Sequence, residues 1–452
     1  MTSVRTGRAS TMQDKKHLYL ALVLGLSLRA VLFFLIYPDK NILLNDDQSL
    51  YVGLSEYLAA HWDFGAGFGP ERVPLYPLFM AVCRMFSKSL FFALAVQNVI
   101  GLAAIYAIYK TGRLFSPKTA SLAAIFAAID LNLAVSCNQL LTEAVFCPLF
   151  CLCLYFLFKY AKEKRARDLA WGAVLLGLCT LVRPVTMYFP VFMLAWLVFQ
   201  KGWSVKVKHA AMFATLFALA VSPWHIRNYI VYGHAALTSQ GGGHIPGWIV
   251  PAVAQYEEGL DLQAATDKYS RMWEEKSQAL PEDVKNDPFA LDEEAKRFGT
   301  EYLLNASPLS IAKAWFWGAM KNVFAPVTIE LAYFLKMDWT HFYETPGKSF
   351  PEQGYNFIFH NKNKVYSLLL ALGIGTVLVF RAVQLMGTRK LFQSDRNIFA
   401  LSCVIIGYFL LVSGPVGYAK YRLPFEPILV LLTALAVSGF SFWTRKTQGK
   451  SP

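Results

Sequence analysis

The sequence predicts an all-α membrane protein with about ten transmembrane helices. Of its 452 residues, 55% are hydrophobic and only 16% are charged, whereas soluble domains carry about 25% charged residues. The hydrophobic residues occur in blocks that approach the roughly 20 residues needed to cross a bilayer. A porin-type barrel is excluded, because its strands would show about 10 residues of alternating polarity. The most prominent blocks are residues 17–37, 89–109, 142–158, 364–386, 397–412 and 425–443.

The positive charge is concentrated in short segments between these blocks. The formal net charge is +13, yet residues 223–364 hold 13 basic and 17 acidic side chains, so the basic excess lies in the rest of the chain. Residues 110–118, 159–167 and 389–396 are segments of this kind. By the positive-inside rule they lie in the cytoplasm, together with both termini. The distribution excludes one broad basic surface, and with it a nucleic-acid partner.

The blocks and the basic loops together predict ten spans that begin and end in the cytoplasm. Residues 168–200 form two short spans, because Arg183-Pro184 interrupts them and a proline both breaks a helix and disfavours helical geometry in the residue before it. The seventh span is expected to end at Ser222-Pro223. In order, the predicted spans are residues 17–37, 89–110, 119–135, 143–159, two within 168–200, 209–221, 364–386, 397–412 and 425–443.

The long hydrophilic stretch after the seventh span divides the chain into three predicted parts. Its middle, residues 261–304, is helical by pattern, with prolines 281, 288 and 308 as breaks. Residues 311–324 mix aromatic residues with lysine, which favours an amphipathic helix at the membrane interface or a partial crossing. The parts are residues 1–222, a transmembrane module with a first outer loop at 38–88; residues 223–363, an outer-face region; and residues 364–452, a second transmembrane module.

The first outer loop carries an acidic pair, Asp46 and Asp47, directly after the first span. Tyr51 follows one helical turn later, at the start of an amphipathic stretch. The pair suits a helix N-terminus, where a carboxylate caps free backbone N–H groups and complements the helix dipole. Carboxylates at the lipid–water boundary also suit a reactive site, and the pattern leaves both interpretations open.

Basic side chains on the outer face run against the positive-inside trend, so each needs an anionic partner. Arg72 stands among prolines just ahead of Tyr76, where it would either clamp a phosphate or anchor at lipid head groups. Lipid phosphates could neutralise each cation separately, and one shared bound phosphate is the alternative. The remaining cations of this group are Arg183, Arg227, Lys420, Arg422 and, two thirds of the way along the first span, Arg29.

Glu143 opens the fourth span, after Leu-Thr. A carboxylate in this position is either a helix cap or a functional acid, since ionisable groups at membrane depth are costly and usually face the interior of the bundle. Together with the acidic pair and the cations, it puts charges of both signs at one membrane face. This convergence indicates a site for a phospholipid-like donor.

The order of these motifs resembles the bacterial GT-C glycosyltransferases, which are grouped with the protein O-mannosyltransferases and the lipid A aminoarabinose transferases. The resemblance implies a GT-C-like bundle with an outer region of short helices. It extends from the first span to the last, although residues 281–354 match nothing in the family. It is carried by Asp47 four residues before Tyr51, Arg72-Val-Pro-Leu-Tyr-Pro, Leu-Thr-Glu143, Arg183-Pro, Pro-Trp-His-Ile-Arg227-Asn-Tyr and a terminal Tyr-Arg422-Leu-Pro.

What the resemblance implies is sugar transfer from a polyprenyl-phosphate donor to an envelope glycolipid such as lipopolysaccharide, another glycan or a protein, on the periplasmic face of the bacterial plasma membrane. Asp47 corresponds to the family's catalytic carboxylate, more closely than Asp46, and would act as the general base of an inverting displacement. Glu143 resembles the second family acid. The donor phosphate is expected at Arg72, Arg183, Arg227, Lys420 and Arg422, and the substrates at Tyr51, Tyr76, Gln240 and His244.

No cofactor is required by this chemistry, but some relatives hold a divalent metal ion beside the first-loop acid. Glu71 and His225 are the candidates for such a site here, with His244 as the alternative histidine. The lipid A branch has lysine where this chain has Arg72. The glycines at 241–243 suit either a sugar-contacting loop or a plain turn. All seven cysteines lie in or beside hydrophobic blocks, which excludes a disulfide within the outer region.

Two other classes compete with an enzyme. A transporter or lipid flippase is often built from inverted repeats, with broken helices that meet at mid-membrane, and the sequence shows neither feature. A non-catalytic scaffold would not require acids and arginines to converge on one face. The sequence therefore favours the glycosyltransferase, while the sugar and the acceptor stay open.

Overall fold

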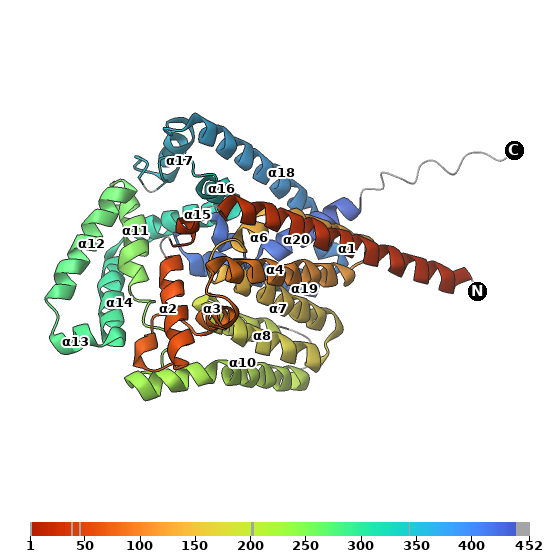
Figure 1. The fold of residues 1–452 in the computed structure, drawn as a ribbon, viewed down its shortest axis with the longest axis horizontal. Helices are drawn as coiled ribbons and strands as arrows, with labels where there is room; N and C mark the ends of the chain where they lie inside the picture. Colours follow the sequence, from red (N-terminus) through yellow and green to blue (C-terminus); the bar gives the residue numbers. More distant parts are fainter. Residues whose placement is uncertain (1, 38, 45–46, 200–202, 343, 440–452) are drawn as a thin grey trace.

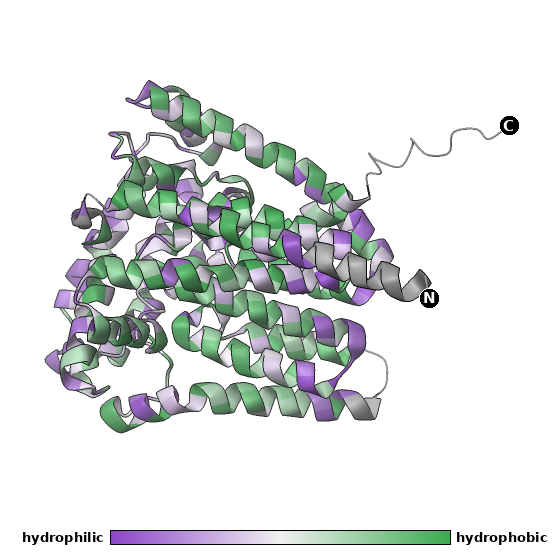
Figure 2. Ribbon diagram, turned by 45° about the vertical axis from the view of Figure 1, so that its right-hand side comes forward, coloured by the Kyte–Doolittle hydropathy of each residue, from purple (hydrophilic) through white to green (hydrophobic). Residues whose placement is uncertain are grey.

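The computed structural model describes residues 2–37, 39–44, 47–199, 203–342 and 344–439, and within these ranges every regular element is helical. Most helices run side by side in one bundle, whereas α2, α12 and α14 stand across its end (Figure 1). Hydrophobic residues dominate the bundle, and hydrophilic residues gather toward its two ends (Figure 2). The prediction of an all-α membrane protein is confirmed.

The helices of the bundle lie where the sequence predicts spans. Six of the described helices, α1, α4, α7, α10, α18 and α19, are long and apolar enough to cross a membrane, and α5, α9 and α20 are shorter apolar helices. The exact count of ten crossings stays a prediction. The bounds are α1 (Thr2–Ile36), α4 (Leu90–Arg113), α5 (Pro117–Ile129), α6 (Leu131–Ser136), α7 (Glu143–Glu163), α8 (Ala166–Val182), α9 (Phe189–Val198), α10 (Trp203–Tyr232), α18 (Lys364–Ser394), α19 (Arg396–Ser413) and α20 (Glu426–Ser438).

The remaining helices form the loops and the end region. The prolines predicted as breaks act as helix starts: Pro288 and Pro308 each occupy a first turn, where a missing N–H costs nothing. The helices expected within residues 261–304 are confirmed. The elements are η1 (Lys40–Leu44), α2 (Asp47–His61), η2 (Ala66–Phe68), α3 (Leu75–Phe86), η3 (Pro184–Thr186), η4 (Ile245–Ile249), α11 (Val250–Glu257), α12 (Leu262–Gln278), α13 (Glu282–Asn286), α14 (Pro288–Asn305), α15 (Pro308–Phe324), α16 (Thr328–Phe334), α17 (Phe350–Phe359) and η5 (Ala419–Arg422).

One predicted boundary is wrong. The helix that contains the seventh predicted span does not end at Ser222-Pro223, because α10 continues through Pro223 to Tyr232. A proline inside a helix leaves the carbonyl four residues earlier without its N–H donor. Here the Ser222 hydroxyl donates to the Leu219 carbonyl at 3.1 Å and replaces that bond. The boundary predicted at residues 222–223 therefore falls inside a helix.

Small residues let the bundle helices approach closely. In α5, Ala120, Ala123, Ala124 and Ala127 are fully buried, as expected for membrane helices that pack through small side chains. The same holds for α18 and α20, where Gly387 lies against the backbone of Leu432 so closely that a Cβ atom would overlap its carbonyl oxygen.

We therefore expect Gly387→Ala to push α18 and α20 apart and to cost about 1–3 kcal/mol of stability. Gly375→Ala, in the same helix, is the matched control, because a Cβ atom there meets nothing within 4 Å and alanine favours a helix by about 0.5–1 kcal/mol over glycine. Thermal unfolding in detergent measures both. Equal melting temperatures for the two variants would contradict the close contact.

Candidate active site

A cavity of about 1410 Å³ lies where the bundle meets the end region. Its walls come from α2, the start of α7, the α8–α9 junction, α15, α16 and the segment around η5. It joins a charged part to an aromatic part. The charged and imidazole side chains that line it are Asp47, Glu71, Arg72, Glu143, Arg183, His244, Lys321, Glu330, His341 and Lys420.

Asp47 is the first residue of α2 and forms an ion pair with Arg72 at 2.8 Å between Oδ1 and Nη2. The Asp47 side chain is 57% exposed, whereas that of Arg72 is only 12% exposed. The carboxylate is therefore both oriented and accessible. The expected helix start is confirmed, while Asp46 lies outside the described residues.

Of two tyrosines near this pair, Tyr51 lines the cavity and Tyr76 is buried in the core. Tyr51 lines the cavity, and burial raises its pKa to about 12. Its ring meets that of Tyr76 edge to face, with 5.1 Å between centroids. Tyr76 is fully buried and donates its hydroxyl to Gln97 Oε1 at 2.7 Å, outside the cavity lining. The prediction that Tyr76 contacts substrate is therefore not supported by its position.

Glu143 and Arg183 form the second ion pair of the cavity. Thr142 joins them, because its hydroxyl donates to Glu143 Oε2 at 3.1 Å and accepts from Arg183 Nη1 at 3.2 Å. Arg183 has an extended backbone at the end of α8, as a residue before proline prefers. The Arg-Pro motif thus ends the helix at the point where the guanidinium meets Glu143.

A further acid of the cavity, Glu330 of α16, has no counterpart among the predicted residues. Gln139 donates to its Oε2 at 2.7 Å, and burial raises the Glu330 pKa. Lys420 lies nearby: burial alone would lower its pKa, but the charges of Tyr421, Glu143 and Glu330 raise it. A carboxylate within the apolar run Val327–Phe334 was the available signal, since such a group needs a partner.

Arg227 holds a loop and does not line the cavity. Its guanidinium donates to the carbonyls of Gly65 at 2.6 Å and Gly69 at 3.1 Å, and also to that of Phe64. It lies 4.6 Å from the centroid of the Trp224 ring. Because these contacts occupy its donors, the prediction of a donor-phosphate contact is corrected to a clamp on the α2–α3 connection.

Arg422 is likewise buried away from the cavity lining. It pairs with Glu426 at 2.6 Å and donates to the Ala325 carbonyl at 2.8 Å, just beyond α15. Arg381 of α18 donates to Val323 O at 2.9 Å. Helix ends leave carbonyls without intrahelical donors, and these two arginines satisfy them for α15. The predicted phosphate contact by Arg422 is corrected accordingly.

Arg29 also turns inward. It is fully buried and donates to the carbonyls of Gly25 at 3.1 Å and Leu133 at 3.4 Å. It therefore ties α1 to α6 within the bundle and does not join the other cations at the cavity.

The remaining predicted residues also differ in whether they line the cavity. Gln240, His244 and Glu71 line the cavity. His225 does not, and its Nδ1 lies 2.6 Å from the Ala235 carbonyl. Glu71 and His225 therefore do not both line the cavity, and within the described ranges no group of three or more histidine, cysteine, aspartate or glutamate side chains could hold a metal ion.

The chain resembles a known protein family in sequence and solved structures in fold. A family model described as dolichyl-phosphate-mannose-protein mannosyltransferase matches residues 71–226. No curated protein matches the sequence. The oligosaccharyltransferase of Archaeoglobus fulgidus is similar in structure, with a TM-score of 0.51, 14% identity, and coverage of 94% of this chain and 50% of that one. ArnT of Cupriavidus metallidurans bound to undecaprenyl phosphate aligns with a TM-score of 0.38 and 13% identity over 92% of this chain and 77% of that one.

The fold similarity to the oligosaccharyltransferase and the helices of membrane length give the fold class. The chain is a multi-pass, all-helical membrane protein with a GT-C-like fold, as the sequence predicts. It spans about half the length of the oligosaccharyltransferase that it matches. The family match over residues 71–226, which include Arg72, Glu143 and Arg183, supports a glycosyltransferase-type enzyme.

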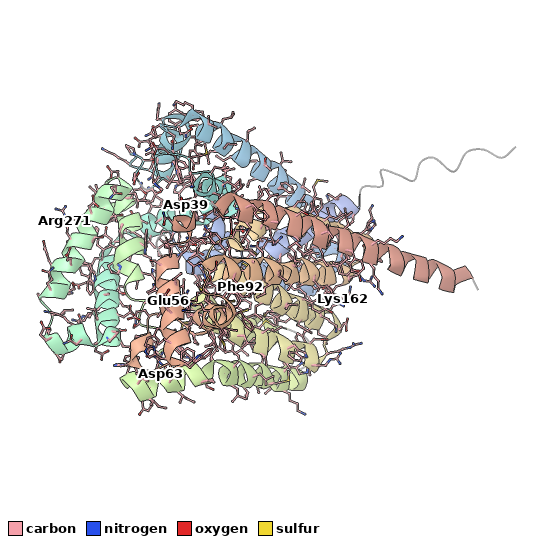
Figure 3. All side chains as sticks on the ribbon, viewed as in Figure 1. Asp39, Glu56, Asp63, Phe92, Lys162 and Arg271 are labelled. Carbon is pink, nitrogen blue, oxygen red and sulfur yellow. The ribbon has the colours of Figure 1, made fainter. Side chains whose placement is uncertain are left out.

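The contacts of Arg227 with residues 64–69 predict what happens when its side chain is removed. We expect Arg227→Ala to destabilise the protein by about 2 kcal/mol or more, because several charge-assisted hydrogen bonds to half-buried carbonyls are lost together. Hydrogen exchange should rise at residues 64–69, near the labelled Asp63 (Figure 3). The control is Arg271→Ala on α12, since that exposed side chain donates to the Asp267 carbonyl of its own helix. Unchanged exchange at residues 64–69 would contradict the clamp.

Proposed function

We propose that this protein is an integral membrane glycosyltransferase. It moves a sugar from a polyprenyl-phosphate donor to a hydroxyl group of an envelope lipid, glycan or protein. The observation that carries the proposal is the cavity itself, which gathers two ion-paired carboxylates, Asp47 and Glu143, with the cations Arg72, Arg183 and Lys420. The matching family is described by a dolichyl-phosphate-linked mannose donor, which belongs to the same chemical class.

Asp47 is the proposed general base. Its described contact involves Oδ1 alone, and the side chain stays 57% exposed, so the carboxylate can accept a proton from an acceptor hydroxyl. The acceptor oxygen then attacks the anomeric carbon from the face opposite the phosphate, a new C–O bond forms, and the configuration inverts. Arg72 orients the carboxylate for this step.

The bond that breaks joins the anomeric carbon to a phosphate oxygen. Polyprenyl phosphate leaves with the electron pair and is a weak base, so it needs charge stabilisation and no proton donor. Preorganised cations in a site shielded from water supply such stabilisation. Arg183 and Lys420 are placed for this role, while Glu143 holds Arg183 and is a candidate for orienting the acceptor.

The proposed location is the bacterial plasma membrane, with both termini in the cytoplasm. The basic loops between the bundle helices set this orientation by the positive-inside rule. The cavity lies at the end of the bundle next to α11–α17, which this orientation assigns to the outer face. Polyprenyl carriers and lipid acceptors can reach that face from the surrounding membrane lipids.

Replacing the base should remove turnover without unfolding the protein. We expect Asp47→Asn to slow transfer by about 100- to 10,000-fold, the range typical of lost general-base catalysis. Glu56→Gln is the matched control, because Glu56 lies on the same helix but pairs with Arg84, outside the cavity lining (Figure 3). The assay incubates purified protein with a panel of polyprenyl-phosphate sugars and acceptors and measures released polyprenyl phosphate by mass spectrometry. Wild-type transfer by Asp47→Asn would rule out the assigned base.

A further inference from the structure

The cations of the cavity differ in how they are neutralised. Arg72 and Arg183 each contact a carboxylate directly, and Lys420 lies in the field of Glu143 and Glu330. Lys321 is different, because in the part of the chain that the structure describes it forms no ion pair with a carboxylate. It lines the same cavity from α15. An anion bound in the cavity could therefore pair directly with the Lys321 ammonium.

The position of Lys321 is set by close packing. Its aliphatic chain lies over Gly417, where an added Cβ atom would overlap Lys321 Cβ and stand 3.1 Å from Cε. The ammonium lies 5.8 Å from the centroids of both the Phe342 and the Phe350 rings. Aromatic faces attract a cation, but they carry no net charge. Burial therefore lowers the Lys321 pKa to about 8.

The walls around this ammonium are aromatic and aliphatic. The Phe342 ring lies 5.8 Å from Phe350 and 5.3 Å from Phe357, between centroids. Leu370 and Ile374 of α18 continue the wall of the cavity. On the same helix Leu368 and Leu372 are 61% and 60% exposed, as residues that face lipid would be. This wall thus connects the ammonium to a membrane helix, which suits an anion carried on a hydrocarbon chain.

We propose that the Lys321 ammonium binds the phosphate of the polyprenyl carrier, and that Phe342, Phe350, Phe357 and the cavity face of α18 receive its first isoprenoid units. This inference rests on the proposed function and adds to it the residue that holds the donor. Arg72 then orients Asp47, while Arg183 and Lys420 keep their proposed role of stabilising the charge on the leaving phosphate. Lys321 supplies a positive charge that forms no ion pair with any carboxylate of the described residues.

The test measures binding, which does not depend on turnover. Full-length protein in detergent is titrated with undecaprenyl phosphate, and native mass spectrometry reports the bound fraction. We expect Lys321→Met to bind about 10- to 100-fold more weakly, the size of a lost charge-assisted hydrogen bond, and Lys321→Arg to keep most of the affinity. Lys313→Met is the matched control, because Lys313 is exposed on the same helix and does not line the cavity.

The pH dependence separates a charge from a packing role. Between about pH 7 and 9.5 empty Lys321 loses its proton, whereas arginine stays charged, so wild-type affinity should fall relative to that of Lys321→Arg. Both proteins share the other cavity groups around α15, so these cancel in the comparison. They are Glu330, Tyr333, His341, Tyr418, Lys420 and Tyr421.

Each outcome decides the inference. Equal affinity of wild type and Lys321→Met overturns it and leaves the proposed transferase intact. Equal weakening by Lys313→Met also overturns it. A parallel titration uses a phosphorylated glycolipid in place of undecaprenyl phosphate. If Lys321→Met weakens binding of that glycolipid only, the site belongs to the acceptor and the donor assignment is wrong. If wild type binds no undecaprenyl phosphate, the proposed donor class fails together with the inference. Should Lys321→Met fail to fold, the pH comparison with Lys321→Arg decides.

Discussion

A charge buried among membrane helices needs a partner, because the apolar surroundings cannot solvate it. The structure meets this requirement in two ways. Arg29, Arg227 and Arg422 donate to backbone carbonyls, and Arg422 adds a carboxylate partner in Glu426. Arg183 instead pairs with an acid at the cavity. The carbonyl or carboxylate partners of each cation therefore decide whether it is available to bind a ligand.

The carbonyl partners also explain how the cavity keeps its shape. Arg422 and Arg381 close the end of α15, and this helix carries Lys321. Arg227 closes the connection between α2, which begins at Asp47, and α3. Both clamps act on segments that contribute to the cavity wall, so the groups proposed for base and phosphate are held in place by arginines that do not line the cavity. In this arrangement a substitution of Arg227 or Arg422 would affect activity by displacing the residues that line the cavity.

Most of the residues predicted for the site line the cavity, although their chemical roles stay predictions. Arg183-Pro and Leu-Thr-Glu143 mark a helix end and a helix start, and both side chains line the cavity. Arg227 and Arg422 carry equally strong motifs, yet they lie behind its walls. Glu330 is marked in the sequence only as a carboxylate within an apolar run, and Lys321 belongs to no recognised motif, so the tertiary structure is needed to place both at the cavity. A motif reports that a charge is present, but the direction of its side chain depends on the helices around it.

The sequence by itself determined the class of protein, because hydrophobic blocks of membrane length and basic loops between them permit few folds besides a helical bundle. It also placed most helices within a few residues, including starts at Asp47 and Glu143. Only the tertiary structure decided which cations face the cavity. That choice depends on carbonyls and carboxylates brought together from distant segments, such as Arg422 with Ala325, and no local pattern encodes such a pairing.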